Sequence, residues 1–537
     1  MSVFSNYKSY KNFAPQYQEW KNNRDFAEEQ RSEYLRRNPS ALNPEDIKRS
    51  RAILRAIDVM DEYSQKNAEN TEVATETIVS NALQFILLIG GGLGWLVTQL
   101  PFNKKIPKGK TGTMTKIASF VGGAFVSTFA AIPLYAWAAK AEVSASRKGR
   151  FEAMKEELND AKTFAVLTPE QEQEVTEILR TLPKEKEQKG PFKNLKESWK
   201  TVKNMVSDST EYLTQRMLFE GRLEEDKLYF DKDLTDKEIE NAKRDQQLLT
   251  SLVEKIDIAS QDYAENAELA TSALITTVTG FSAIFSMLYS KIAQHFKWKN
   301  TSTPGILGII ATMGASIYAA QIQKQASRVG RFKVKQELLN NPEKLAYVEA
   351  SKSDEITDIN VKPYKKMGML KFLKNAWKDN RAYNKWEKNE GKQEKNIARA
   401  MKQLEMSEEQ IKDAKRLQHN TFKTFNKVDE NSQKYSESIE ALGQGLQIPL
   451  SLIFSGIGLL FGMKHLTKAM NSSTKNDKIS GMTKYMFIVL LSTLPSIGIN
   501  AYITKEQKKA SRVADMLAIN ELSDYKNFAD YSRFKDK

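Results

Sequence analysis

The chain has 537 residues, of which 40% are hydrophobic and 28% are charged, and its mean hydropathy is −0.53. This composition is too polar for a chain that lies mostly within a membrane and too apolar for a disordered one. The absence of cysteine excludes disulfides, iron–sulfur clusters and thiolate metal sites, and three histidines leave little room for a histidine metal site or a Ser-His-Asp triad. The net charge of +14 favours anionic partners.

Six segments without a charged residue or histidine interrupt this polar chain. A helix needs about 20 apolar residues to cross a hydrocarbon core about 30 Å thick, and these segments are close to that length. They form three pairs with short basic loops between partners: 77–100 with 117–139, 269–290 with 304–322, and 441–463 with 485–503. Buried helices of soluble proteins usually keep a polar stripe, and none of the six carries a charged one. We therefore expect a multi-pass membrane protein, with six buried helices of a soluble protein as the alternative.

The sequence repeats three times, with matching signatures in the same order. The first signature precedes each pair of apolar segments and reads SQKNAENTE at 64–72, SQDYAENAE at 260–268 and SQKYSESIE at 432–440. The second follows each pair and reads ASRKGRF at 145–151, ASRVGRF at 326–332 and ASRVADM at 510–516. A helix-capping pattern begins before each first signature, at Asn43, Thr235 and Ser407.

These matches predict three units, 1–190, 191–370 and 371–537. Each unit has a polar helical arm, a two-span hairpin and a second polar helical arm. Strand-like alternation is missing from the sequence, so the predicted fold class is all-α, with three tandem helical hairpins flanked by long arms that pair as coiled coils do.

The recurring polar residues are the candidate site, as a structural or interaction signature. They are Ser64, Gln65, Glu69, Glu72, Ser146, Arg147 and Arg150 in the first unit; Ser260, Gln261, Glu265, Glu268, Ser327, Arg328 and Arg331 in the second; and Ser432, Gln433, Glu437, Glu440, Ser511 and Arg512 in the third.

Each first arm is acidic near its apolar segment, and each second arm is basic. A hairpin returns the chain to the side that it left, so the two arms of one unit should emerge together. We expect ion pairs within each unit: Glu69 with Arg147, Glu265 and Glu268 with Arg328 and Arg331, and Glu437 with Arg512. A ligand or ion site repeated three times is the alternative interpretation of the same residues.

Inside the apolar segments the sequence indicates close helix packing. Gly90 with Gly94, and Gly458 with Gly462, form GxxxG patterns that let helices approach in lipid. Proton relays and coupled ion carriers usually need a charged residue within the membrane, and these segments have none. His295, His419 and His465 have no second ligand at a suitable spacing, and we find no catalytic, cofactor or metal constellation.

Three classes of function remain. The first is a non-enzymatic membrane scaffold or interaction protein, with anionic lipid headgroups and a protein partner or second copy as its partners. The second is a six-span transporter or channel with pseudo-threefold symmetry. Nucleic-acid binding is the weakest, because the lysines are scattered among acids rather than grouped with aromatic residues. The basic loops favour arms outside by the positive-inside rule, but a highly charged 76-residue tail is difficult to translocate, so we expect cytoplasmic arms.

Overall fold

The structure is a computed structural model that describes residues 3–61, 63–64, 145–146, 148–150, 152–154, 160–182, 234–295, 322, 326–357, 359, 369–386, 392–425, 427–429, 431–432, 435, 438–439, 461, 464–465 and 474–528. All regular structure in these ranges is helical and none is strand, which confirms the all-α prediction for them. Within the same ranges, no helix combines the length and the apolarity needed to cross a bilayer.

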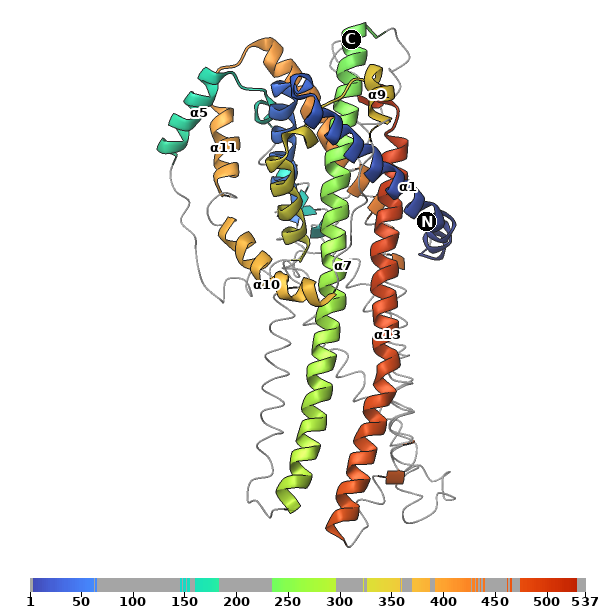
Figure 1. Cartoon of the computed structure of the whole chain (residues 1–537). Coiled ribbons are helices and arrows are strands. Elements are labelled where there is room, and N and C mark those ends of the chain that lie inside the picture. Colours follow the sequence, from blue (N-terminus) through green and yellow to red (C-terminus); the bar gives the residue numbers. More distant parts are fainter. Residues whose placement is uncertain are drawn as a thin grey trace, which may run out of the picture.

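Two long antiparallel helices lie side by side along the molecule (Figure 1). They are α7 (Asp236–His295) and α13 (Lys475–Glu521). The 60 residues of α7, at about 1.5 Å each, make it about 90 Å long. Each helix contains one predicted apolar segment, 269–290 or 485–503, so arm and segment belong to one unbroken helix.

The other predicted segments lie outside the described residues. They are 77–100, 117–139, 304–322 except residue 322, and 441–463 except residue 461. Gly90, Gly94, Gly458 and Gly462 lie outside them as well, so the predicted close packing at these glycines stays a prediction.

Shorter helices surround the long pair (Figure 1). Helix α1 (Val3–Arg37) crosses α13, and α10 (Met369–Trp386) crosses α7. Helix α5 (Pro169–Thr181) packs against α11 (Lys392–Lys402) to one side. The remaining short elements are α9 (Ser353–Thr357), η1 (Pro39–Ala41), η4 (Ala161–Phe164), η6 (Pro342–Lys344), η7 (Ala350–Lys352) and η9 (Tyr525–Phe528).

The predicted capping residues begin helices in all three units. Thr235 Oγ1 accepts a hydrogen bond from Glu238 N at 3.4 Å, and the Glu238 carboxylate accepts one from Thr235 N at 2.8 Å. Ser407 and Gln410 form the same reciprocal pair, and Asn43 Oδ1 accepts from Glu45 N at 3.0 Å. The caps satisfy N–H groups that have no partner within the helix, which fixes where each first arm starts.

The main apolar core joins the first arms of all three units. Many of its buried side chains come from the helix over 44–61, from residues 242–256 of α7 and from the helix over 408–425 with its continuation to 428, and second-arm residues such as Met154, Leu338 and Ile519 join them. Phe164, Leu345 and Phe528 are fully buried, and each lies at the end of, or directly after, a 3-10 turn that follows a second arm. The polar arms therefore form one shared core rather than three separate hairpins.

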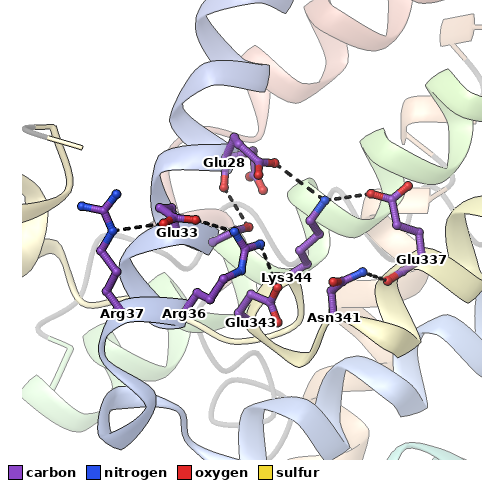
Figure 2. Close-up of polar contacts among 10 residues, drawn as sticks. Glu28, Glu33, Arg36, Arg37, Glu337, Asn341, Glu343 and Lys344 are labelled. Atoms are coloured by element: carbon purple, nitrogen blue, oxygen red, sulfur yellow. Dashed lines mark hydrogen bonds and ion pairs between the residues drawn. The ribbon is translucent and has the colours of Figure 1, made fainter. Parts of the chain in front are cut away.

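A network of surface ion pairs connects the C-terminal end of α1 with η6, the 3-10 turn that follows the second arm of the second unit (Figure 2). Arg36 forms ion pairs with Glu33 of its own helix and with Glu343, where the Nη2–Oε1 distance is 3.0 Å. Lys344 Nζ lies 2.8 Å from Glu337 Oε1. Exposed pairs of this kind contribute only about 0–1 kcal/mol each, so they orient α1 more than they stabilise the fold.

Candidate functional site

Buried and half-buried charges occur in two layers on either side of the main core. We call the first the distal layer, because it is far from the apolar segments; it comprises Asp46, Arg49, Arg244, Asp245, Asp413 and Arg416. The second is the proximal layer, which comprises Asp61, Arg150, Asp257, Arg331, Asp429 and Asp515. Asp245 and Asp257 are 12 residues apart on α7, so the layers are about 18 Å apart.

The proximal layer is built from equivalent positions of the three units. One aspartate lies three residues before the first serine of each first signature: Asp61, Asp257 and Asp429. Each second signature contributes the residue four positions after its serine: Arg150, Arg331 and Asp515. The layer is thus formed by the repeated residues themselves, but the third unit carries an acid where the others carry arginine.

Two of the ion pairs in this layer join different units. Arg331 of the second unit has its Nε 2.9 Å from Asp61 Oδ2 of the first unit. Arg150 of the first unit pairs with Asp429 of the third, and its Nε is 4.0 Å from Asp61 Oδ1. Burial raises the pKa of Asp61 to about 6, although Arg331 and Arg150 act to lower it. Buried pairs are costly to break from one side, so the layer fixes how the units fit together.

At the third position, two carboxyl groups face each other. Asp515 of α13 is fully buried, and its carboxyl group lies next to that of Asp257 of α7. Gln261 Nε2 donates to Asp515 Oδ2 at 2.9 Å and to Asp257 Oδ2 at 3.2 Å. Burial, followed by the adjacent Asp257 carboxylate, raises the pKa of Asp515 well above its ordinary value.

The two signatures of a unit touch through their small residues. Ser64 and Ser146 hydroxyls are 2.6 Å apart in the first unit, and Ser432 contacts Ser511 in the third. In the second unit Gly330 lies so close to Ser260 that an added Cβ would be 3.0 Å from its Cα. These contacts confirm the prediction that the two signatures of a unit pack against each other.

The predicted pair of Glu265 with Arg331 within the second unit is wrong, and the other predicted pairs stay predictions. Glu265 pairs with Arg512 of the third unit, whose Nη2 is also 3.0 Å from Asp262 Oδ1. Arg331 pairs with Asp61 of the first unit and not with Glu265. The reason is geometric: in the second unit the second arm packs by Gly330 against its own first arm and turns Arg331 towards the first unit.

Several residues of the predicted signatures cannot be placed in the proximal layer. Gln65, Glu69, Glu72, Arg147, Gln433, Glu437 and Glu440 lie outside the described residues, as does the side chain of Glu268. Ser327 and Arg328 are half-buried on the second arm of unit two.

The sequence interpretation missed Asp257, Asp429 and Asp515. Two signals were present. The first signature extends three residues upstream as Asp-x-x-Ser in all three units, and the second changes from arginine to aspartate only in the third unit. A change of charge sign at a repeated position indicates a local difference in chemistry.

A separate cavity of about 420 Å³ lies between α1, the start of α7 and the segment around Tyr347. Its lining includes Arg24 and Arg31, but these already pair with Glu254 and Glu28. The proximal layer, with its unbalanced charge, is the stronger candidate site.

Metal chemistry has little support from the described residues, among which no group of three or more His, Asp or Glu side chains has an arrangement that could hold a metal ion. Comparison with known proteins gives no family either. No protein-family model, no curated protein and no solved structure matches the chain.

Proposed function

We propose that the protein is a non-enzymatic, multi-pass membrane scaffold. Three apolar hairpins, made of the six predicted spans, would anchor one compact helical head at the membrane surface. The head would present its arms to a protein partner or to a second copy of the chain, and the lysine-rich loops between spans would contact anionic headgroups.

The observation that carries this proposal is the continuity of α7. This helix supplies six buried side chains of the main core, one aspartate of each ionic layer and the apolar segment 269–290. Helix α13 likewise combines the second signature of the third unit with the segment 485–503. A head built on such helices cannot rotate freely against its anchors, which suits a protein that holds partners at a fixed height and orientation.

The pairing of buried charges supports a structural role over catalysis. Most acids and bases of the two layers are satisfied by each other across units, and ion pairs between units stabilise an assembly rather than a reaction. The arms carry most of the chain's mass, and we place them in the cytoplasm with both termini on the same side.

A six-span transporter or channel is the second candidate. The observation in its favour is the pseudo-threefold proximal layer, which lies closer to the apolar segments of α7 and α13 than the distal layer does. Repeated units are common in transporters.

The first experiment tests membrane insertion and topology. Tags at Met1 and Lys537 in sealed vesicles should both be digested, or both protected, because paired spans return the chain to its starting side. Opposite accessibility of the tags, or release of the protein by alkaline carbonate, would contradict the proposal.

The second experiment separates the two candidates. Purified protein in vesicles should not accelerate release of small ions or sugars above protein-free vesicles, and it should retain a stoichiometric partner or dimer in detergent. Robust solute movement would replace the scaffold by the transporter.

A further inference from the structure

The third unit breaks the charge pattern of the proximal layer at one residue. Arg150 and Arg331 bring a positive charge to the aspartates around them, whereas Asp515 brings a second carboxyl group to Asp257. Asp515 is fully buried and Asp257 is half-buried, so two ionised carboxylates at this place repel each other strongly and need a compensating positive charge.

We propose that Asp257 and Asp515 form a proton-binding site that holds one proton between them at neutral pH, and that this proton fastens α7 to α13. The inference concerns the head alone and stands whether or not the apolar segments enter a bilayer.

The hydrogen bonds around the pair favour a shared proton. Gln261 uses its amide donors on Asp257 Oδ2 and on Asp515 Oδ2. Asp515 Oδ1 is buried, and no N–H or O–H of the described residues donates to it. A proton between the two carboxyl groups supplies this missing hydrogen bond, and buried polar atoms are seldom left without one.

No base in the described part of the chain is available to replace the proton. On α13, Arg512 is paired with Asp262 and Glu265. The other charged groups nearby pair with one another as Arg331 with Asp61, Arg150 with Asp429 and Asp61, and Lys335 with Asp58.

The uncharged polar groups around the pair complete the site. From α1, the buried hydroxyl of Tyr17 faces this region, and its pKa is raised chiefly by burial, with smaller contributions from acids that include Asp515. Ser432 lies within hydrogen-bonding range of both Gln261 and Asp515. None of these groups brings a positive charge, so loss of the proton leaves two negative charges between two long helices.

The direction of the pH effect follows from the raised pKa of Asp515. An acid whose pKa is higher in the folded state stabilises that state most at low pH, and the contribution disappears as pH rises through the folded pKa. Alkaline pH should therefore loosen the contact between α7 and α13.

Infrared spectroscopy of the full-length chain in detergent tests the proton directly. At about pH 8 Asp61, with a pKa of about 6, is ionised, and replacement of Asp515 or Asp257 identifies the C=O stretch of a protonated carboxylic acid that comes from the pair. Asp515→Asn and Asp257→Asn should each remove this band. Asp25→Asn, at an exposed position of α1, is the matched control and should retain it.

Two infrared outcomes would overturn the proposal. One is the absence of the band in the wild-type protein. The other is calcium or sodium bound to the purified protein together with a band that appears only after the ion is removed, since the carboxyl groups would then be ligands of that ion.

Spin labels test the fastening of the helices. The chain has no cysteine, so single cysteines at Asn266 on α7 and Lys505 on α13 can be labelled without background. The distance distribution should broaden or lengthen from neutral to alkaline pH in the wild-type background. In Asp515→Asn, whose amide can hydrogen-bond without a proton to lose, the distribution should not change with pH.

Asp515→Arg provides a stronger test of the proposal, because the first two units carry arginine at the equivalent position. This variant should also become insensitive to alkaline pH. If Asp515→Arg does not fold, Asp515→Asn still decides the question. Equal pH responses of wild type and Asp515→Asn would show that the proton does not fasten the helices.

Discussion

The two ionic layers of the head differ in charge balance. The distal layer has three aspartates and three arginines, whereas the proximal layer has four aspartates and two arginines. In the distal layer the single residue Asp245 has three polar partners, Arg49, Arg416 and Asn420. In the proximal layer Asp515 has a carboxyl group and an amide as neighbours.

This difference separates two uses of buried charge. A balanced layer needs no proton and defines which units fit together at all pH values at which aspartate is ionised. An unbalanced layer depends on proton binding, so its strength varies with pH. One residue, Asp515 in place of arginine, accounts for the whole imbalance.

The largest effect should come from the distal layer. Asp245→Asn removes the charge that faces Arg49 and Arg416, and Asp245 is fully buried. Because two buried guanidinium groups would then share the half-exposed Asp413 as their remaining counter-ion, we expect a loss of about 3–5 kcal/mol in unfolding free energy. Denaturant titration followed by circular dichroism measures it. Asp354→Asn, at an exposed position, is the control, and a loss no greater than the control's would show that the distal layer does not define the assembly.

Asp61 should give the proximal layer a pH-dependent stability. Its pKa in the folded protein is about 6 against an ordinary value of 3.8. The stabilisation is therefore full below the ordinary value and is lost as pH rises through about 6, with a slope of at most about 1.4 kcal/mol per pH unit. Asp61→Asn should remove this slope in thermal melts recorded across that window. A difference between wild type and variant that grows in favour of wild type as pH rises would contradict the assignment.

The helical framework of the head could be predicted from the sequence, but the pairing of charged side chains between units could not. Helical arms, their starting caps and the contact between paired signatures followed from residues such as Thr235, Ser407 and Ser64, whose effects are local or repeated. The partner of Glu265 did not follow, because the repeat says which residues are equivalent but not which unit lies beside which. The distal layer was invisible for another reason: Arg49 and Asp245 occupy equivalent positions with opposite charge, so they form no repeated pattern.

A smaller effect should come from the close approach that positions the proximal layer. A Cβ on Gly330 would lie 2.7 Å from the carbonyl oxygen of Ala259 and 2.8 Å from Tyr263 Cβ. Because backbone must move to admit it, Gly330→Ala should cost about 1–3 kcal/mol, although alanine is the better helix former by about 1 kcal/mol. Chemical denaturation measures the change. The third unit has Ala514 at the equivalent position, so Ala514→Gly is the reverse control, and a stabilised Gly330→Ala would show that the helices are not in close contact.

The smallest effect should distinguish pairing between units from pairing within one. Arg512 contacts Glu265 and Asp262, and these side chains are 12%, 17% and 40% exposed. Such partly exposed pairs contribute about 1 kcal/mol or less, so single replacements are uninformative, and the coupling energy must come from a double-mutant cycle. Arg512→Gln with Glu265→Gln should show a coupling of about 0.5–1 kcal/mol that weakens in high salt.

The matched cycle of Arg331→Gln with Glu265→Gln, which tests a pair within the second unit, should show none, because Arg331 contacts Asp61. Coupling in the second cycle and not in the first would mean that each hairpin closes on its own charges, and the proximal layer would then no longer join the three units.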